Sequence, residues 1–158
     1  MQTRIGFGYD VHKLEDGIPF RLGGIDIPHS KGAKGHSDAD TLVHAICDAL
    51  LGAAALGDIG QHFPDNSDNY KDINSLFLLE RTIRMINDLG YAISNIDSTV
   101  CLQNPKIAPY VEDMRSALSL AMGIDRNQVS VKATTEEKLG FTGREEGIAA
   151  YAVVLIVK

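Results

Sequence analysis

The sequence predicts one domain over residues 1–158, of the α+β class, with a mixed four-stranded sheet and helices packed on one face. The length of 158 residues is that of a single domain and suffices to bury a core without disulfides. Apolar residues recur with a helical period in three stretches, and helices separate the later strands. With the helices on one face, the second face of the sheet remains to be covered, and a symmetric oligomer could cover it.

The N-terminal quarter of the chain is predicted to be extended. Residues 4–9 form a short strand, and residues 20–27 form a second strand that ends at Pro28. A polar loop that contains glycine follows over residues 29–40 and offers little to bury.

Three helices are predicted, over residues 40–55, 72–89 and 105–122. Polar residues of the type that caps helix N-termini precede the first, and Gly90 and Gly123 end the second and third. Each helix carries apolar residues three and four positions apart, so that one side of it can pack on the sheet.

Three further strands are predicted, over residues 91–103, 128–133 and 148–157. The last is an apolar run rich in Val and Ile, which indicates a buried strand because a bilayer span needs ~20 residues. Residues 134–146, between the last two strands, are predicted to form a loop with one helical turn.

Charge and cysteine content exclude several classes of partner. The chain has 15 Lys and Arg against 21 Asp and Glu, a net charge of −6, which argues against binding nucleic acid or a membrane surface. The N-terminus lacks the apolar core of a signal peptide. Cys47 and Cys101 lie in apolar stretches and form no C-x-x-C pair. We therefore expect a cytoplasmic protein with two buried, reduced cysteines.

Three residues from two elements suggest a metal centre. Asp10 and His12 lie two residues apart at the end of the first strand, so their side chains project to the same face. His44 lies in the first turns of the first helix. One carboxylate and two imidazoles would make a three-ligand zinc site with an open position, which is the arrangement of catalytic zinc. The alternative is an Asp–His hydrogen bond at a strand end and a histidine buried in the core.

Two further segments carry polar groups with more than one interpretation. His36, Ser37 and Asp38 precede the first helix, where they suit either a phosphate site or a plain N-cap. Residues 132–144 combine hydroxyls, carboxylates, lysines and an arginine, which suits either Mg²⁺ beside phosphates or a solvated charged turn. This second segment lacks the Walker A string.

Five strings occur in one order along the chain: GYDVH at 8–12, HSDAD at 36–40, AAALGDIG at 53–60, FPD at 63–65 and the segment 131–144. In this combination the sequence resembles the 2-C-methyl-D-erythritol 2,4-cyclodiphosphate synthases of the non-mevalonate isoprenoid pathway. The resemblance runs from Arg4 to the last strand. The combination is more specific than any of its strings alone.

The resemblance implies two metal ions in each active site. The ligands of a zinc ion would be Asp10, His12 and His44. A second ion, Mg²⁺ or Mn²⁺, would be contacted through Glu137. His36 and Thr135 would be the catalytic residues that position the phosphates and stabilise the transition state.

The resemblance also implies a substrate pocket in two parts. Residues that match the methylerythritol part are Asp58, Ile59, Gly60, Phe63, Pro64 and Asp65. Residues that match the cytidine diphosphate part are Leu102, Gln103, Asn104, Pro105, Lys106, Ile107, Ala108, Ala133 and Thr134. Further ligand positions are matched by Ser37, Phe141 and Arg144.

The reaction that the resemblance implies joins two phosphates of one substrate. 4-Diphosphocytidyl-2-C-methyl-D-erythritol 2-phosphate would cyclise to 2-C-methyl-D-erythritol 2,4-cyclodiphosphate with loss of CMP. The family assembles as a homotrimer, with the second sheet face in the trimer core and active sites between subunits. Some members bind an isoprenoid diphosphate in a central cavity. The alternatives are a zinc-dependent phosphohydrolase and a non-catalytic trimer that binds a nucleotide or an isoprenoid diphosphate.

Overall fold

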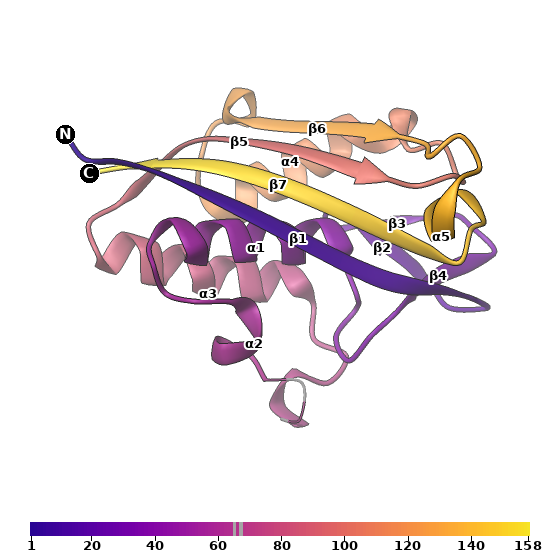
Figure 1. Cartoon of the computed structure of the whole chain (residues 1–158). Coiled ribbons are helices and arrows are strands. Elements are labelled where there is room, and N and C mark those ends of the chain that lie inside the picture. Colours follow the sequence, from indigo (N-terminus) through magenta and orange to yellow (C-terminus); the bar gives the residue numbers. More distant parts are fainter. Residues whose placement is uncertain (65, 67) are drawn as a thin grey trace.

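The computed structural model describes residues 1–64, 66 and 68–158, and it confirms an α+β fold built on a mixed sheet (Figure 1). The sheet has five strands in the order β4-β1-β7-β5-β6. Their bounds are Thr3–Asp16 (β1), Lys31–Lys34 (β4), Ala92–Cys101 (β5), Val129–Thr134 (β6) and Gly147–Val157 (β7). β5 and β6 are parallel, and the other neighbouring strands are antiparallel.

The prediction of a four-stranded sheet was wrong, because β4 adds an edge strand to it. Its four residues show no apolar alternation, so the sequence offered no local signal for it. β4 forms because it pairs with the far end of β1, where Leu14 lies opposite Ala33. β1 therefore continues to Asp16 instead of ending at Tyr9.

Residues 20–27 form a separate hairpin instead of one strand. β2 (Phe20–Leu22) and β3 (Ile25–Ile27) pair in an antiparallel sheet of their own. Gly23 and Gly24 between them have φ angles of 60° and 81°. Because glycine adopts this left-handed region without steric cost, the chain reverses here.

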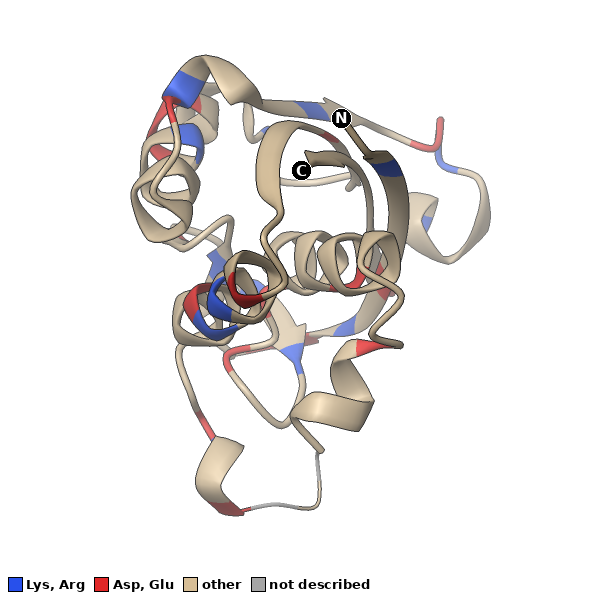
Figure 2. Ribbon diagram, turned by 90° about the vertical axis from the view of Figure 1, so that its left-hand side faces the viewer, with Lys and Arg blue, Asp and Glu red and all other residues tan. Residues whose placement is uncertain are grey.

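The three predicted long helices are present and lie on one side of the sheet (Figures 1 and 2). They are α1 (Thr41–Ala53), α3 (Ser75–Asp88) and α4 (Val111–Met122). α1 packs on β1 and β7, α3 packs on α1, and α4 packs on β6. Residues of both charge signs lie along α3 and α4 (Figure 2). None of the described helices is long and apolar enough to cross a bilayer.

Short helices complete the connections between the long elements. Their bounds are Ile59–His62 (α2), Gly140–Gly143 (α5), Asp68–Tyr70 (η1), Ala108–Tyr110 (η2) and Arg126–Gln128 (η3). α5 is the single helical turn predicted before the last strand. α2 lies between the first two predicted helices, where no helix was predicted, and it begins because the Asp58 side chain accepts a hydrogen bond from the Gln61 amide.

Two glycines of β1 let α1 lie directly against the sheet. A Cβ atom added to Gly6 would lie 1.8 Å from the carbonyl oxygen of Ala49, and one on Gly8 would lie 1.9 Å from that of Ala45. No side chain fits between these backbones, so the helix axis approaches β1 more closely than ordinary packing allows. This approach brings the start of α1 to the end of β1 that carries Asp10 and His12.

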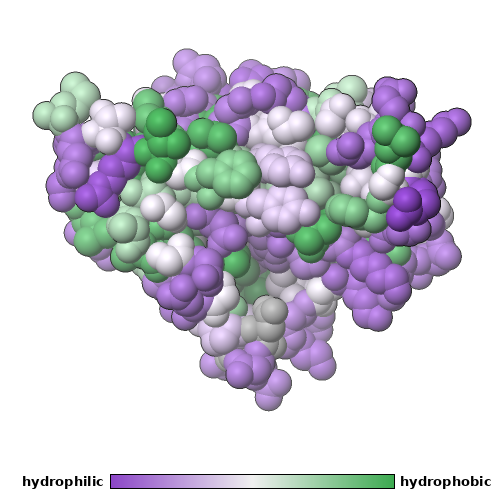
Figure 3. All heavy atoms as spheres, in the orientation of Figure 1, coloured by the Kyte–Doolittle hydropathy of each residue, from purple (hydrophilic) through white to green (hydrophobic). Residues whose placement is uncertain are grey.

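The other face of the sheet exposes apolar side chains (Figure 3). The members of this outer-face patch are Ile5, Phe7, Tyr9, Val11, Tyr151 and Val153. They alternate along β1 and β7 with residues that face the helices, as the pleat of a sheet requires. A contiguous apolar patch of this kind is typical of a protein interface. Both cysteines are buried as free thiols.

Candidate active site

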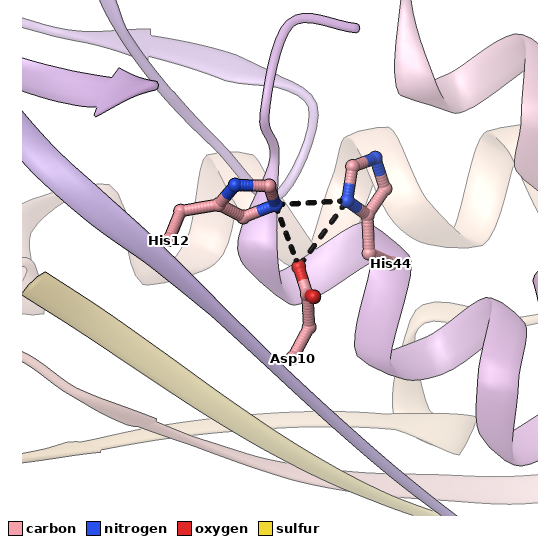
Figure 4. A group of neighbouring side chains, drawn as sticks. All are labelled: Asp10, His12 and His44. Carbon is pink, nitrogen blue, oxygen red and sulfur yellow. Dashed lines mark hydrogen bonds and ion pairs between the residues drawn. The ribbon is translucent and has the colours of Figure 1, made fainter. Parts of the chain in front are cut away.

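Asp10, His12 and His44 converge at one end of the β1–α1 contact (Figure 4). Their facing atoms are Asp10 Oδ2, His12 Nε2 and His44 Nδ1, with separations of 2.9 Å, 3.2 Å and 3.3 Å between the three pairs. Asp10 and His12 come from alternate positions of β1, and His44 comes from the first turn of α1. Among the described residues, these three are the group of His, Cys, Asp and Glu side chains that could hold a metal ion.

The hydrogen bond behind His12 prepares this ring as a metal ligand. Its Nδ1 atom lies 3.0 Å from the carbonyl oxygen of Lys34, which can only accept. Nδ1 therefore carries a proton, and Nε2, which faces Asp10 Oδ2, is the ring atom left to bind a metal. Two imidazoles and a carboxylate form a donor set that suits zinc, and bonding of the outer nitrogen to a carbonyl is common among metal-bound histidines.

Opposing effects set the pKa values of the cluster. Burial raises the pKa of the Asp10 carboxyl, but hydrogen bonds to His12 and His44 outweigh it, so the pKa lies below its usual value. Burial lowers the pKa of His12, and the hydrogen bond to Asp10 reverses this, so the net pKa is raised. Asp10 is therefore ionised at neutral pH, as a metal ligand must be.

A cavity of about 200 Å³ opens beside the cluster. Its lining residues include Asp10, His12, His36, Ser37, His44, Ile59, Gly60 and Phe63, all of them predicted site residues. Gly35, Tyr70 and Leu78 also line it and were not predicted. Leu78 belongs to the apolar stripe of α3, so no sequence signal separates it from the core residues around it.

The α2 segment forms one wall of this cavity because Asp48 holds it. The carboxylate of Asp48, one turn after His44 on α1, accepts a 2.7 Å hydrogen bond from the amide of Ile59. Asp58 caps α2, and its side chain bonds Gln61 instead of lining the cavity. Pro64 is exposed beyond it. Asp65, also predicted to bind substrate, lies outside the described residues.

A second pocket, of about 160 Å³, gathers most of the residues predicted for cytidine diphosphate. Its lining residues are Leu102, Pro105, Lys106, Ile107, Ala108, Ala133, Thr134 and Thr135. Gln103 and Asn104 do not line it. Their side chains bond instead to the amide of Lys138 and the carboxylate of Glu145. Thr135 thus lies at this second pocket and not in the cavity beside the metal cluster.

The predicted second metal ligand lies apart from the first cluster. The hydroxyl of Thr135 lies 3.4 Å from a carboxylate oxygen of Glu137, and neither residue lines the cavity beside Asp10. Phe141 lines a third, smaller hollow at the outer sheet face, and the guanidinium of Arg144 pairs with Glu146 at 2.7 Å. A single chain therefore does not bring all the predicted residues into one site.

An open three-ligand centre beside a cavity on an α+β fold is typical of metal-dependent enzymes. The profile of the YgbB family matches residues 3–157 of this chain. The chain is 58% identical over 153 residues to the 2-C-methyl-D-erythritol 2,4-cyclodiphosphate synthase of Syntrophomonas wolfei, covering 97% of this chain and 98% of that protein. It therefore belongs to the YgbB family of cyclodiphosphate synthases, which are enzymes of isoprenoid biosynthesis.

Solved structures of relatives share the whole fold. The bifunctional IspDF of Campylobacter jejuni is 40% identical with a TM-score of 0.95, and the match covers 98% of this chain and 42% of that longer one. The CDP complex of IspF from Plasmodium falciparum is 35% identical with a TM-score of 0.86, covering 98% of this chain and 96% of that one.

Proposed function

We propose that this chain converts 4-diphosphocytidyl-2-C-methyl-D-erythritol 2-phosphate to 2-C-methyl-D-erythritol 2,4-cyclodiphosphate and CMP. The observation that carries the proposal is the Asp10–His12–His44 cluster beside a cavity, in a chain 58% identical to a synthase of that name. The 2-phosphate attacks the β-phosphorus of the same substrate, a new P–O–P bond forms, and CMP leaves. The attacking phosphate is already ionised, so the chain needs no serine or cysteine nucleophile.

The residues of the cavity suit a reaction that depends on position and charge. Asp10, His12 and His44 would hold a zinc ion that, when bound, polarises the diphosphate and offsets its charge. His36 and Ser37 line the same cavity and would hold the phosphates in place. Bringing the two ends of a flexible substrate together supplies several kcal/mol as effective molarity, on the order of the known intramolecular gains.

The second pocket suits the nucleotide end of the substrate. A relative is solved as a CDP complex, and the pocket at Leu102 to Ala108 gathers most of the residues that the resemblance assigns to cytidine diphosphate. Lys106 would supply positive charge near the diphosphate, and Glu137 would contact Mg²⁺ or Mn²⁺. Apolar groups of Leu102 and Ile107, both buried, would form the wall against the base.

We also propose that the chain works as a homotrimer in the cytoplasm. The outer-face patch would form the trimer core, and the separation of Glu137 from the Asp10 cluster suggests that neighbouring subunits complete each site. Arg144, paired with Glu146, would meet an isoprenoid diphosphate if one binds in a central cavity.

Phe7→Glu tests the assembly. Phe7 is 62% exposed at the centre of the outer-face patch, and a carboxylate there would be buried without a partner in the trimer. We expect sedimentation velocity to give the mass of one chain instead of three, with loss of synthase activity. Leu120→Glu is the matched control, because Leu120 is 84% exposed on α4, away from this face. Three-chain particles of Phe7→Glu would contradict the proposed trimer core.

Glu137→Gln tests the second metal. Removing the charge of this carboxylate, while keeping its size, should raise the Mg²⁺ concentration for half-maximal activity by about tenfold or more. The zinc content should stay unchanged, because Glu137 lies apart from the Asp10 cluster. Glu136→Gln removes the neighbouring charge as a control. An unchanged Mg²⁺ titration of Glu137→Gln would show that Glu137 is not a ligand.

Phosphorus NMR of the cytidine-linked substrate tests the activity itself. The purified protein with Zn²⁺ and Mg²⁺ should yield two coupled resonances of a cyclic diphosphate together with free CMP. A linear diphosphate would mean that water attacks the phosphorus and that the chain is a phosphohydrolase. Unchanged substrate in the presence of bound metal would favour a non-catalytic binding protein.

A further inference from the structure

His44 contacts a chain of buried polar groups on the side away from the metal cluster. Figure 4 shows its second ring nitrogen pointing away from Asp10 and His12. This Nε2 atom lies 2.9 Å from the hydroxyl of Ser75. Ser75 is the first residue of α3 and is fully buried. The Ser75 hydroxyl donates to the carboxylate of Asp38, and the Ser75 amide donates to the same group at 2.9 Å.

Asp38 is held so that it can only accept. Besides the two bonds from Ser75, its carboxylate accepts a 3.2 Å hydrogen bond from the amide of Asp40. The guanidinium Nε of Arg21, on β2, lies 3.2 Å from its other oxygen as an ion pair. The three hydrogen bonds of the carboxylate all come from N–H or O–H groups, so the hydroxyl proton of Ser75 is committed to Asp38.

This commitment decides where the proton of His44 lies. A hydroxyl has one proton, so the Ser75 oxygen can only accept from the ring of His44. Nε2 must then carry a ring proton. Nδ1 faces Asp10 Oδ2 and His12 Nε2, and in the neutral ring it is the atom left to bind a metal. Ser37 also lies 3.1 Å from Nε2, and its own hydroxyl is free to donate or to accept. Ser37 alone would therefore not fix the tautomer.

We propose that Ser75 and Asp38 are positioning residues that fix the neutral tautomer of His44 required for a metal on Nδ1. The inference rests on the proposed function only in taking His44 as a metal ligand. Ser75 thereby connects the N-terminus of α3 to the metal centre. Arg21 connects the hairpin that contains β2 to it, through the ion pair with Asp38. The outer nitrogens of both histidines are then bonded to acceptors, and their inner nitrogens are left, with the Asp10 carboxylate, to bind one metal ion.

The tautomer can be read without metal and without turnover. Long-range ¹H–¹⁵N NMR of the metal-free protein distinguishes the protonated from the unprotonated ring nitrogen of His44. We expect the wild-type chain to carry the proton on Nε2. Asp38→Asn should move it toward Nδ1, because an amide NH₂ donates to the Ser75 oxygen and frees the Ser75 proton for His44. Zinc affinity, measured against a competing chelator, should fall by about 10- to 100-fold.

A second variant and a matched control complete the test. Ser75→Ala removes the acceptor and should give a mixed tautomer with weaker zinc binding, while Ser75→Thr restores the hydroxyl and should rescue both. Ser119→Ala deletes a buried helical hydroxyl of α4 that bonds only the carbonyl of Ser116, and it should change neither. If Asp38→Asn does not fold, the Ser75 pair of variants decides.

The outcomes separate this inference from the proposed function. A His44 proton that stays on Nε2 in folded Asp38→Asn and Ser75→Ala, with unchanged zinc affinity, would overturn the inference. A wild-type chain that binds no zinc would overturn the metal assignment, and the tautomers of the metal-free variants would still decide whether Ser75 and Asp38 fix the His44 proton.

Discussion

His44→Ala should lose bound zinc and synthase turnover together while the chain keeps its fold. Removing one of three ligands leaves Asp10 and His12, which cannot enclose an ion alone. A bound metal supplies several kcal/mol to a phosphoryl transfer, so turnover should fall on the order of 10³-fold or more. The fold should persist because alanine favours the helix and Ser75 keeps its bond to Asp38.

Zinc per chain by mass spectrometry, turnover by phosphorus NMR and the melting temperature together check this expectation. His29→Ala is the control, since His29 lies outside the cavity, with its ring 6.1 Å from that of Phe20. It should retain zinc and turnover. Full activity of a metal-depleted His44→Ala protein would exclude this cluster as the source of catalytic metal.

The helices could be predicted from sequence because their signals are local. The apolar stripe of α1 and the capping side chain of Asp40 lie within one segment, and the Asp40 carboxylate does accept from the amide of Val43. β4 could not be predicted in this way. Its four residues are two lysines, a glycine and an alanine, with no strand-like alternation, and the strand segment that stabilises it is the far end of β1.

In the candidate site too, local relations between residues could be predicted and distant ones could not. The shared face of Asp10 and His12 follows from the period of a strand, so it could be predicted without a structure. His44 lies beside this pair because α1 packs on β1. The resemblance implied that the three residues share a site, but no spacing along the chain indicated how the helix packs. Ser75 was missed because its hydrogen bond to His44 spans 31 residues and no local motif marks it.

Gly8→Ala should destabilise the fold strongly and weaken the metal centre with it. The added methyl carbon would lie 1.9 Å from the carbonyl oxygen of Ala45 and 2.7 Å from the amide nitrogen of Ala49. Both are backbone atoms of α1, so no side chain can rotate away and the helix itself must move. We expect a loss of about 3 kcal/mol or more in the free energy of unfolding, at the upper end for overpacked cores.

Gly52→Ala is the matched control and should act in the opposite direction. Gly52 is exposed near the end of α1, where an added Cβ would meet nothing closer than 4.0 Å. Alanine there should stabilise the helix by about 0.5–1 kcal/mol, since glycine is the poorer helix former. Urea unfolding of the metal-free proteins measures both changes. A Gly8→Ala protein as stable as wild type would mean that α1 can move off β1 without cost.

Zinc titration of folded Gly8→Ala then relates packing to chemistry. Ala45 follows His44 directly, so a displacement of α1 at this contact moves His44 away from Asp10. We expect the zinc affinity of Gly8→Ala to fall even under conditions where the protein stays folded, and that of Gly52→Ala to remain unchanged. The glycine that admits the helix to the sheet would thereby set the distance between the metal ligands, although it contacts no ligand atom itself.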